Sequence, residues 1–395
     1  MKPDKPAGHG EMRRHNLLLV LSNIGGHWPI SKPELAEMTG LSWGAVASTT
    51  EELLKRGLVQ AAKTPLEGLG RNPALFRLRK DARYSLGIDL GFSDVRGVLI
   101  DLEGSTVDSL VENSPLGSAS PEETIKHCCA MARKIVRKSK LPNGKLLGIG
   151  IGIPGSADHE KGICLGLPNL PRWTNVPVAK LVASQLPLPV MLDRRGNCVA
   201  YAERHYGAAL RLDHAICVSM GEELTAGFIL NGVVYRGLGN SAGEIGQMAM
   251  TSEPHVARLV ERVSIEWLTS AWKQITGQAT ATLDEIHELA MAGNAKAEEL
   301  FEELGSILGV ALGNLVSLLS PQRIVLGGRL ANSRPLFEKA MRESLAKVVG
   351  RAAQFDVQTS QLGEMDVAKG AAALLMDRAF STGEGLLTNV RAVTE

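Results

Sequence analysis

Apolar and polar positions between residues 30 and 59 alternate at the spacing of two short helices. Ser31 is followed three residues later by Glu34, the pattern of a capping box at the start of a helix. Leu35 and Met38 give this first helix an apolar side, which we expect to face inward.

The turn and the second helix follow directly. Gly40 is expected to end the first helix, because glycine tolerates the left-handed conformation of a tight turn. Ser42 can cap the second helix, from which Val46, Leu53 and Leu54 would face inward. This spacing is typical of a helix-turn-helix, whose second helix enters the major groove of DNA. An ordinary helical hairpin is the alternative on these features alone.

Residues 60–79 read as two short strands around a glycine-rich loop, the pattern of the wing in a winged helix. Gly68, Gly70, Arg71 and Asn72 would form the tip of this loop. Arg71 is well placed there for a phosphate group or a minor groove. The wing makes an ordinary helical hairpin a weaker explanation of the segment before it.

The distribution of charge along the chain gives modest support to DNA binding by the N-terminal residues. Residues 1–80 hold 12 Lys and Arg against 7 Asp and Glu, a net charge of +5 in a chain whose total is +1, so residues 81–395 carry −4. Basic charge is thus concentrated where DNA would lie. The candidate DNA contacts are Arg13, Arg14, Lys32, Ser42, Trp43, Ser48, Thr49, Lys55, Arg71 and Asn72.

Length and composition bound the class of protein. A chain of 395 residues with 44% hydrophobic and 22% charged residues is typical of a globular protein of two or three domains. The polar start predicts no signal peptide, and no apolar run approaches the roughly 20 residues that cross a bilayer. Five scattered cysteines lack metal-ligand spacing and suit a reducing compartment. We therefore expect a cytoplasmic protein with no membrane partner.

Beyond a boundary near residues 80–85, strands alternate with helices. Residues 87–104 predict a strand, a tight turn and a second strand, with an acidic residue and a glycine before the turn. Phosphate-binding hairpins of the actin-like ATPase fold begin in this way, although an ordinary β-hairpin explains the pattern equally well. The alternation indicates two α/β lobes around a cleft. Further strands are expected within 147–155, 190–197, 219–232 and 324–330, and a long helix at 299–319.

Four motifs follow the helix pair in a specific order: IDLG, GIPG, GNSAGEIGQM and VLGG. With the N-terminal helices they resemble the ROK family (repressors, open reading frames and sugar kinases) from about residue 12 to residue 380. The regulator branch is the most similar, because free-standing kinases of the family lack the N-terminal helices. The resemblance implies a sugar-responsive regulator, a homodimer or homotetramer, with its sugar site between the lobes.

The expected fold combines two parts. Residues 1–82 would form an all-α winged helix-turn-helix domain that binds double-stranded DNA. Residues 83–395 would form a two-lobed α/β domain of the actin-like ATPase (ROK/sugar kinase) fold, for effector binding and oligomerisation. Its lobes would cover roughly 83–198, with part of the C-terminus, and 199–380.

The segment that carries the base in family kinases departs from the family pattern. Kinases have an ENDAN-like sequence whose aspartate takes the proton of the sugar hydroxyl, and this chain has DRRGN. Arg195 stands at the aspartate's place, where a permanently protonated guanidinium cannot act as a base. Arg194 replaces an asparagine, and Asn197 keeps its match. The alternative is that both arginines turn away and pair with surface carboxylates.

The phosphate loops depart as well. Phe92 and Ser93 replace glycine and threonine in the first loop, and Glu222 and Glu223 stand in the second, where carboxylates repel a triphosphate. We therefore expect no enzyme activity and no nucleotide cofactor.

The resemblance also implies a zinc cluster that this sequence lacks. Gln247 replaces a ligand histidine, no cysteine occurs in residues 249–265, and His255 stands alone. One histidine cannot complete a four-ligand zinc site, so we expect no metal.

The helix expected to read DNA is unusual in composition. Family regulators often carry SRATVSR, whereas this chain has SWGAVAS, with no basic residue before Lys55. Trp43 and Thr49 could contact thymine methyl groups or phosphates. Affinity would then depend on basic residues outside this helix.

The resemblance places the effector in the cleft, where Glu244 and Glu266 would accept hydrogen bonds from sugar hydroxyls. Two guanidiniums in a partly dry cleft need an anion, so we expect an anionic sugar derivative. In the competing account, Glu222 and Glu223 neutralise them internally. The candidate effector-binding residues are Asn169, Arg194, Arg195, Asn197, Glu244, Gln247 and Glu266.

The function expected from all these features is a DNA-binding transcriptional regulator, a repressor of carbohydrate metabolism genes that responds to a sugar-like effector. Two alternatives stay open at this point. One is an ATP-dependent sugar kinase with an appended DNA-binding domain, and Arg195 disfavours it. The other is a regulator that binds DNA independently of any ligand.

Overall fold

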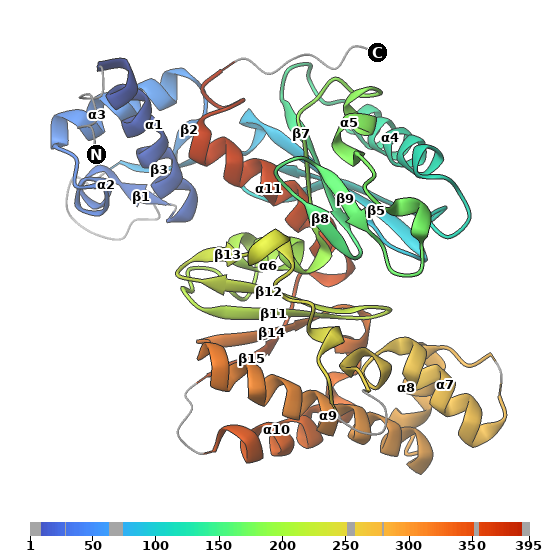
Figure 1. Ribbon diagram of the computed structural model, residues 1–395. Helices are drawn as coiled ribbons and strands as arrows, with labels where there is room; N and C mark the ends of the chain where they lie inside the picture. Colours follow the sequence, from blue (N-terminus) through green and yellow to red (C-terminus); the bar gives the residue numbers. More distant parts are fainter. Residues whose placement is uncertain are drawn as a thin grey trace.

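The computed structural model describes residues 9–27, 29–62, 74–250, 257–278, 280–350 and 355–388. They form an N-terminal unit (residues 9–82) and two α/β lobes, one on each side of a central pair of helices (Figure 1). The loop tip expected at Gly68, Gly70, Arg71 and Asn72, and His255, lie outside the described residues.

Among its described residues, the N-terminal unit contains three α-helices and a three-stranded antiparallel sheet in the order β1-β3-β2, so the expectation of an all-α unit is wrong. Strands β2 and β3 are the two short strands expected within residues 60–79. The elements are α1 (His9–Gly26), β1 (Ile30–Ser31), α2 (Lys32–Thr39), α3 (Trp43–Lys55), β2 (Val59–Ala62) and β3 (Leu75–Leu78).

The caps of α2 and α3 form as their sequences predict. The backbone N–H of Ser31 donates to Glu34 Oε2 at 2.8 Å, and the Ser31 hydroxyl accepts from the Glu34 backbone N–H. Gly40 ends α2 with φ 67°, the left-handed value expected there. The Ser42 hydroxyl accepts from the backbone N–H of Ala45 at 3.3 Å and starts α3.

Two residues expected to face inward are instead exposed. Leu35 and Leu53 are fully buried, but Met38 is 45% and Leu54 38% exposed. Leu54 lies about 100° around the helix from Leu53, which turns it out of the buried stripe. Helix α2 is only 8 residues long and Leu35 is its buried residue, so Met38, one turn further on near the end of the helix, lies at the edge of the core.

The first lobe contains a five-stranded sheet in the order β10-β7-β4-β5-β6. Strands β4, β7 and β10 are parallel, so their carboxyl ends meet at one edge. The elements of this lobe are β4 (Tyr84–Leu90), β5 (Asp94–Asp101), β6 (Thr106–Asn113), α4 (Pro121–Lys138), β7 (Leu146–Ile153), β8 (Ser156–Asp158), β9 (Ile163–Gly166), α5 (Val178–Ala183) and β10 (Val190–Arg194).

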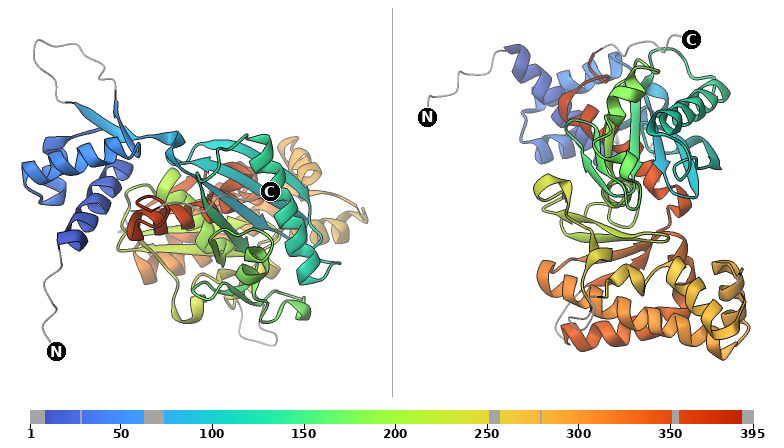
Figure 2. Two further views of the ribbon diagram at one scale, coloured as in Figure 1. Left: turned by 90° about the horizontal axis from the view of Figure 1, so that it is seen from above. Right: turned by 45° about the vertical axis from the view of Figure 1, so that its right-hand side comes forward.

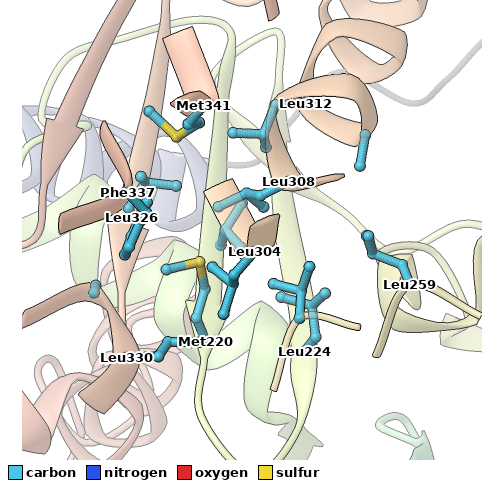
Figure 3. Close-up of a cluster of buried hydrophobic side chains, with 14 of the residues drawn as sticks. Met220, Leu224, Leu259, Leu304, Leu308, Leu312, Leu326, Leu330, Phe337 and Met341 are labelled. Carbon is cyan, nitrogen blue, oxygen red and sulfur yellow. The ribbon is translucent and has the colours of Figure 1, made fainter. Parts of the chain in front are cut away.

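The second lobe repeats this plan with a sheet in the order β13-β12-β11-β14-β15. Its core lies between the sheet and helices α9 and α10, where Leu304, Leu308, Phe337 and Met341 interdigitate (Figure 3). The elements are β11 (Ala215–Met220), β12 (Leu224–Leu230), β13 (Val233–Tyr235), α7 (Ile265–Thr276), α8 (Leu283–Met291), α9 (Ala295–Leu319), β14 (Arg323–Gly327), α10 (Arg334–Val349) and β15 (Asp356–Thr359).

Helix α9 has the length and apolar composition of a helix that could cross a membrane. This differs from the expectation that no apolar run comes near that length. Its apolar residues have another explanation, because Leu300, Phe301, Leu304 and Leu308 belong to the core of the second lobe. Because these side chains are buried in the lobe, α9 is a core helix of the protein.

Helices α6 (Arg195–Tyr206) and α11 (Asp366–Thr382) cross between the two sheets. A Cβ at Gly370 would lie 1.7 Å from the carbonyl oxygen of Cys198, so only glycine permits this crossing. Helix α11 runs on to the N-terminal unit, which sits beside the first lobe and away from α8, α9 and α10 (Figures 1 and 2).

The N-terminal unit shares its hydrophobic core with α11 and the first lobe. Leu21 and Ile24 of α1 belong to the same buried cluster as Ile100 of β5 and Ala372 and Met376 of α11. The unit is therefore attached to the lobes through packed apolar surface as well as through the chain.

Leu53 and Leu54 form a matched pair for testing this packing. Leu53→Ala should destabilise the N-terminal unit by about 2–5 kcal/mol, because it leaves a cavity in a closed core. Leu54→Ala should cost less than about 1 kcal/mol, because the side chain is partly in water. Thermal unfolding of the two full-length variants measures the difference, and equal losses would contradict the burial of Leu53.

Candidate functional site

A cleft of about 760 Å³ lies between the lobes, next to the carboxyl ends of strands β7 and β10. Open α/β sheets bind their ligands at such strand ends. Side chains expected from the sequence to bind the effector line this cleft together: Asn169, Arg194, Arg195, Glu244, Gln247 and Glu266.

Arg194, the last residue of β10, is 1% exposed and joins the two lobes. Its guanidinium donates to the carbonyl oxygen of Gly155 in the first lobe at 3.2 Å. It also donates to the carbonyl oxygens of Asn240 and Ala242 in the second lobe and forms an ion pair with Glu244. The charge of Arg194 is therefore satisfied within the protein.

Arg195 is paired in the same way. Its Nε lies 2.9 Å from Asp89 Oδ1, at the end of β4, and its Nη1 lies 3.5 Å from Glu223 Oε2, in the turn between β11 and β12. The two arginines do not turn away toward surface carboxylates, which was the alternative. Each pairs with a carboxylate that is buried or lines the cleft.

Burial governs the titration of these carboxyl groups. It raises the pKa of Glu223 to about 7 although Arg195 opposes the shift. Burial also raises the pKa of Asp366, at the start of α11, to about 7. Burial alone would lower the pKa of Arg195, but Asp89, Glu223 and Asp366 raise it above its ordinary value. Arg195 thus stays charged at the meeting point of both lobes and α11.

This pairing removes the reason to expect an anionic ligand. That expectation needed two guanidiniums without partners, and both have carboxylate partners inside the protein. The charged residues that line the cleft include four carboxyl groups and three guanidiniums. Glu223, with a pKa of about 7, is only partly ionised at neutral pH, so the cleft is close to neutral and does not favour an anion. Arg258 lines the cleft although it was not among the residues expected from the sequence.

Asn197 does not line the cleft, contrary to the expectation that it contacts the effector. It is fully buried, and its amide donates to Asp193 Oδ1 and to Asn240 Oδ1, each at 2.8 Å. Arg236 pairs with the same Asp193 at 2.9 Å. This network connects the loop before Glu244 to the end of β10, and no sequence motif indicated it.

The loops that hold nucleotide phosphates in family kinases are closed by polar contacts. The Ser93 hydroxyl, from the first lobe, donates to Glu222 of the second. Together with Arg195 and Glu223 they line a space of about 70 Å³, small beside the neighbouring cleft. Two carboxylates and a bridging ion pair at this position do not fit a triphosphate.

The residues at the family's zinc position do not fit a metal either. Gln247 is exposed at the cleft, and an amide is a poor zinc ligand. Within the part of the chain that the structure describes, no three His, Cys, Asp or Glu side chains come together in a way that could hold a metal ion.

The outer face of α3 points into solvent. Trp43, Ser48, Glu51 and Lys55 are exposed on it. Thr49 is only 7% exposed and belongs to the buried side of the helix, so the expectation that it contacts DNA is wrong. Adjacent residues of a helix lie about 100° apart, so Thr49 faces inward although its neighbour Ser48 faces solvent.

Several basic residues near α3 already have partners. Arg13 donates to Glu52 at 2.8 Å, and Arg14 donates to the carbonyl oxygen of Thr382 at the end of α11. The ammonium group of Lys32 lies 5.6 Å from the ring centre of Phe76. Arg14 in particular connects the N-terminal unit to α11.

The fold and the cleft define a two-lobed protein of the sugar kinase and regulator class. Residues 85–378 match the ROK family, and the chain belongs to that family.

Two curated relatives are similar over most of the chain. The xylose repressor of Bacillus subtilis is 28% identical over 372 residues, which cover 93% of this chain and 96% of the relative. The DNA-binding transcriptional dual regulator NagC of Escherichia coli is 22% identical over 351 residues, covering 83% and 85%.

Solved structures show the same fold. A ROK family transcriptional regulator, a homologue of the Escherichia coli MLC protein, has a TM-score of 0.79 at 20% identity and covers 95% of this chain and 98% of its own. A ROK family glucokinase from Streptomyces griseus, solved with glucose and AMPPNP, has a TM-score of 0.66 at 23% identity. It covers 98% of its own chain but only 74% of this one.

Asp366 offers a test of the buried charges beside Arg195. Because its folded-state pKa is raised, its contribution to stability is full at low pH and is lost as the pH rises through about 7. Asp366→Asn keeps the acceptor for the Val367 backbone N–H and removes the charge. It should raise the stability by about 1–3 kcal/mol at pH 8 and by less at pH 5.

Thermal unfolding at both pH values measures this effect. Asp284→Asn is the matched control, because the Asp284 side chain is 78% exposed. A gain at pH 8 that is no larger than the gain at pH 5 would contradict the proposed burial of charge at Asp366.

Proposed function

We propose that this protein is a DNA-binding transcriptional repressor of carbohydrate metabolism genes, and that a sugar in the cleft controls its affinity for DNA. One observation carries the proposal: the unit that contains the capped helix pair is packed through α1 onto α11, whose other end lies beside Arg195. The names of the xylose repressor and NagC relatives support it.

In this proposal the N-terminal unit is a winged helix-turn-helix. Helix α3 is the recognition helix, and the hairpin of β2 and β3 forms the base of the wing. Ser42, Trp43 and Ser48 would face DNA bases or the adjoining backbone. Arg71 and Asn72 stay proposed contacts of the wing tip, and Arg13, Lys32 and Lys55 proposed phosphate contacts.

In this proposal, DNA binding and effector binding belong to different parts of the chain. Residues 1–82 would bind DNA, and residues 83–395 would bind the effector and assemble the oligomer, as a cytoplasmic homodimer or homotetramer. Paired recognition helices need a two-fold axis, since half-sites lie about 34–36 Å apart along DNA.

The proposed effector is a neutral sugar. Asn169, Gln247 and Glu266 line the cleft and supply amide and carboxylate groups suited to sugar hydroxyls. Glu244 lines it too, already paired with Arg194. Because the chain is similar to a xylose repressor and to an N-acetylglucosamine repressor, xylose and N-acetylglucosamine are the first neutral sugars to test.

An ATP-dependent sugar kinase is the second candidate, supported by the fold that the Streptomyces griseus glucokinase shares. Three features argue against it. Arg195 cannot serve as a base, Glu222 and Glu223 repel phosphates, and the phosphate end of the cleft is bridged by ion pairs.

Ligand binding can be tested by thermal shift of the full chain. A neutral sugar that fits should raise the melting temperature more than its phosphate ester does, because Arg194 and Arg195 are already paired with carboxyl groups of the protein. Glu266→Gln should reduce this shift. Glu288→Gln, on the outside of α8, is the control and should leave it unchanged. Stronger stabilisation by sugar phosphates would contradict a neutral effector.

The kinase alternative has its own test. With ATP and magnesium, the full chain should transfer no phosphate to glucose, xylose or N-acetylglucosamine above the level of a blank, because no base stands at position 195. Transfer of radiolabelled phosphate measures this directly. Sugar-dependent phosphate transfer would overturn the non-enzyme proposal.

A further inference from the structure

The outer face of α3 carries a large aromatic side chain in water. Trp43, the first residue of the helix, is 59% exposed. Apart from its chain neighbours and the backbone of its own helix, no heavy atom of the described residues lies within 4 Å of a Cβ placed at Gly44, the next residue. More than half of this residue therefore lies in water, and exposed aromatic side chains are typical of binding surfaces.

The rest of this face has little capacity for hydrogen bonding to bases. Ser48 donates its hydroxyl proton to the carbonyl oxygen of Ala45 at 3.1 Å, and Ser42 uses its hydroxyl as the helix cap. Glu51 is exposed on the same side. The side chains that usually read guanine or adenine through paired hydrogen bonds, Arg, Lys, Asn and Gln, are missing between residues 42 and 54.

The nearest cation on α3 is too far away to assist at the first turn. Lys55 lies 12 residues beyond Trp43, about 18 Å along the helix axis. Lys55 can therefore meet a phosphate at the groove edge while Trp43 lies over bases. The N-terminal residues of a recognition helix are the ones that reach base edges in a helix-turn-helix.

We propose that Trp43 determines sequence specificity through apolar contact with a thymine methyl group in the major groove. The inference rests on the proposed function of DNA binding. The thymine C5-methyl is the one apolar group that base pairs present in that groove, so a face with an indole and small residues is complementary to it. Each DNA half-site would then hold one thymine at a fixed position.

The experiment starts from a pool of duplexes with about 20 randomised base pairs, from which the full chain selects its preferred sequence. In the selected duplex, each thymine is then replaced in turn by deoxyuridine, which lacks the methyl group and keeps every hydrogen-bonding group. At one position per half-site, this replacement should weaken binding about fourfold, the effect of losing one buried methyl group.

Variants of Trp43 test whether its side chain makes the contact with this methyl group. Trp43→Ala should bind the selected duplex more weakly and no longer distinguish thymine from deoxyuridine at the position. Trp43→Phe keeps an apolar ring without the indole N–H and should keep the distinction. Met38→Ala removes another exposed apolar side chain of the same unit, on α2, and should leave both affinity and distinction unchanged. Unfolding temperatures of the variants check that the fold is intact.

The possible outcomes separate this inference from the proposed function. If the unmodified chain enriches no sequence, the proposed function fails and this inference fails with it. If a sequence is enriched but Trp43→Ala keeps the fourfold penalty, or Trp43→Phe loses it, only the thymine contact is wrong. Loss of self-association in Trp43→Ala, with DNA binding retained, would assign the face to a second copy of the chain.

Discussion

Two adjacent guanidiniums, those of Arg194 and Arg195, lie between the lobes, and the arrangement of the cleft depends on their pairing. A buried charge without a partner costs several kcal/mol, so each must find a carboxylate or several carbonyl groups. Arg194 donates a hydrogen bond to Gly155 of the first lobe and forms an ion pair with Glu244 of the second. Arg195 forms ion pairs with Asp89 and Glu223. The contacts of these two arginines thus join the lobes at the cleft.

Helix α11 extends from this junction to the N-terminal unit. Its first residue, Asp366, interacts electrostatically with Arg195, and its last residue, Thr382, accepts a hydrogen bond from Arg14 of α1. At 17 residues the helix spans about 25 Å. A ligand that changed the angle between the lobes would displace this rigid element, and the packed surface of α1 would follow. Such a displacement would alter the spacing of paired recognition helices.

Local features of the structure could be predicted from sequence, and long-range partners could not. The caps at Ser31 and Ser42 depend on residues three positions away, so the chain alone specifies them. The inward or outward direction of Leu54 and Thr49 depends on which side of α3 meets the core, and the expectation was wrong for both.

The same limit applies to the cleft. The types of its residues were apparent in DRRGN and AGEIG, but their pairing was not. Asn197 was expected to contact the ligand because the matching residue does so in the family. In the structure its amide is instead held in the interior by Asp193 and by Asn240, which is 43 residues away in the sequence.

The central claim, that the cleft and the DNA site are coupled, can be tested with the full chain, a selected duplex and a neutral sugar that binds. Thermodynamic linkage requires that the sugar weaken duplex binding by the same factor by which the duplex weakens sugar binding. We predict a common factor of about five or more; an unchanged duplex affinity when the cleft is saturated with sugar would contradict the account.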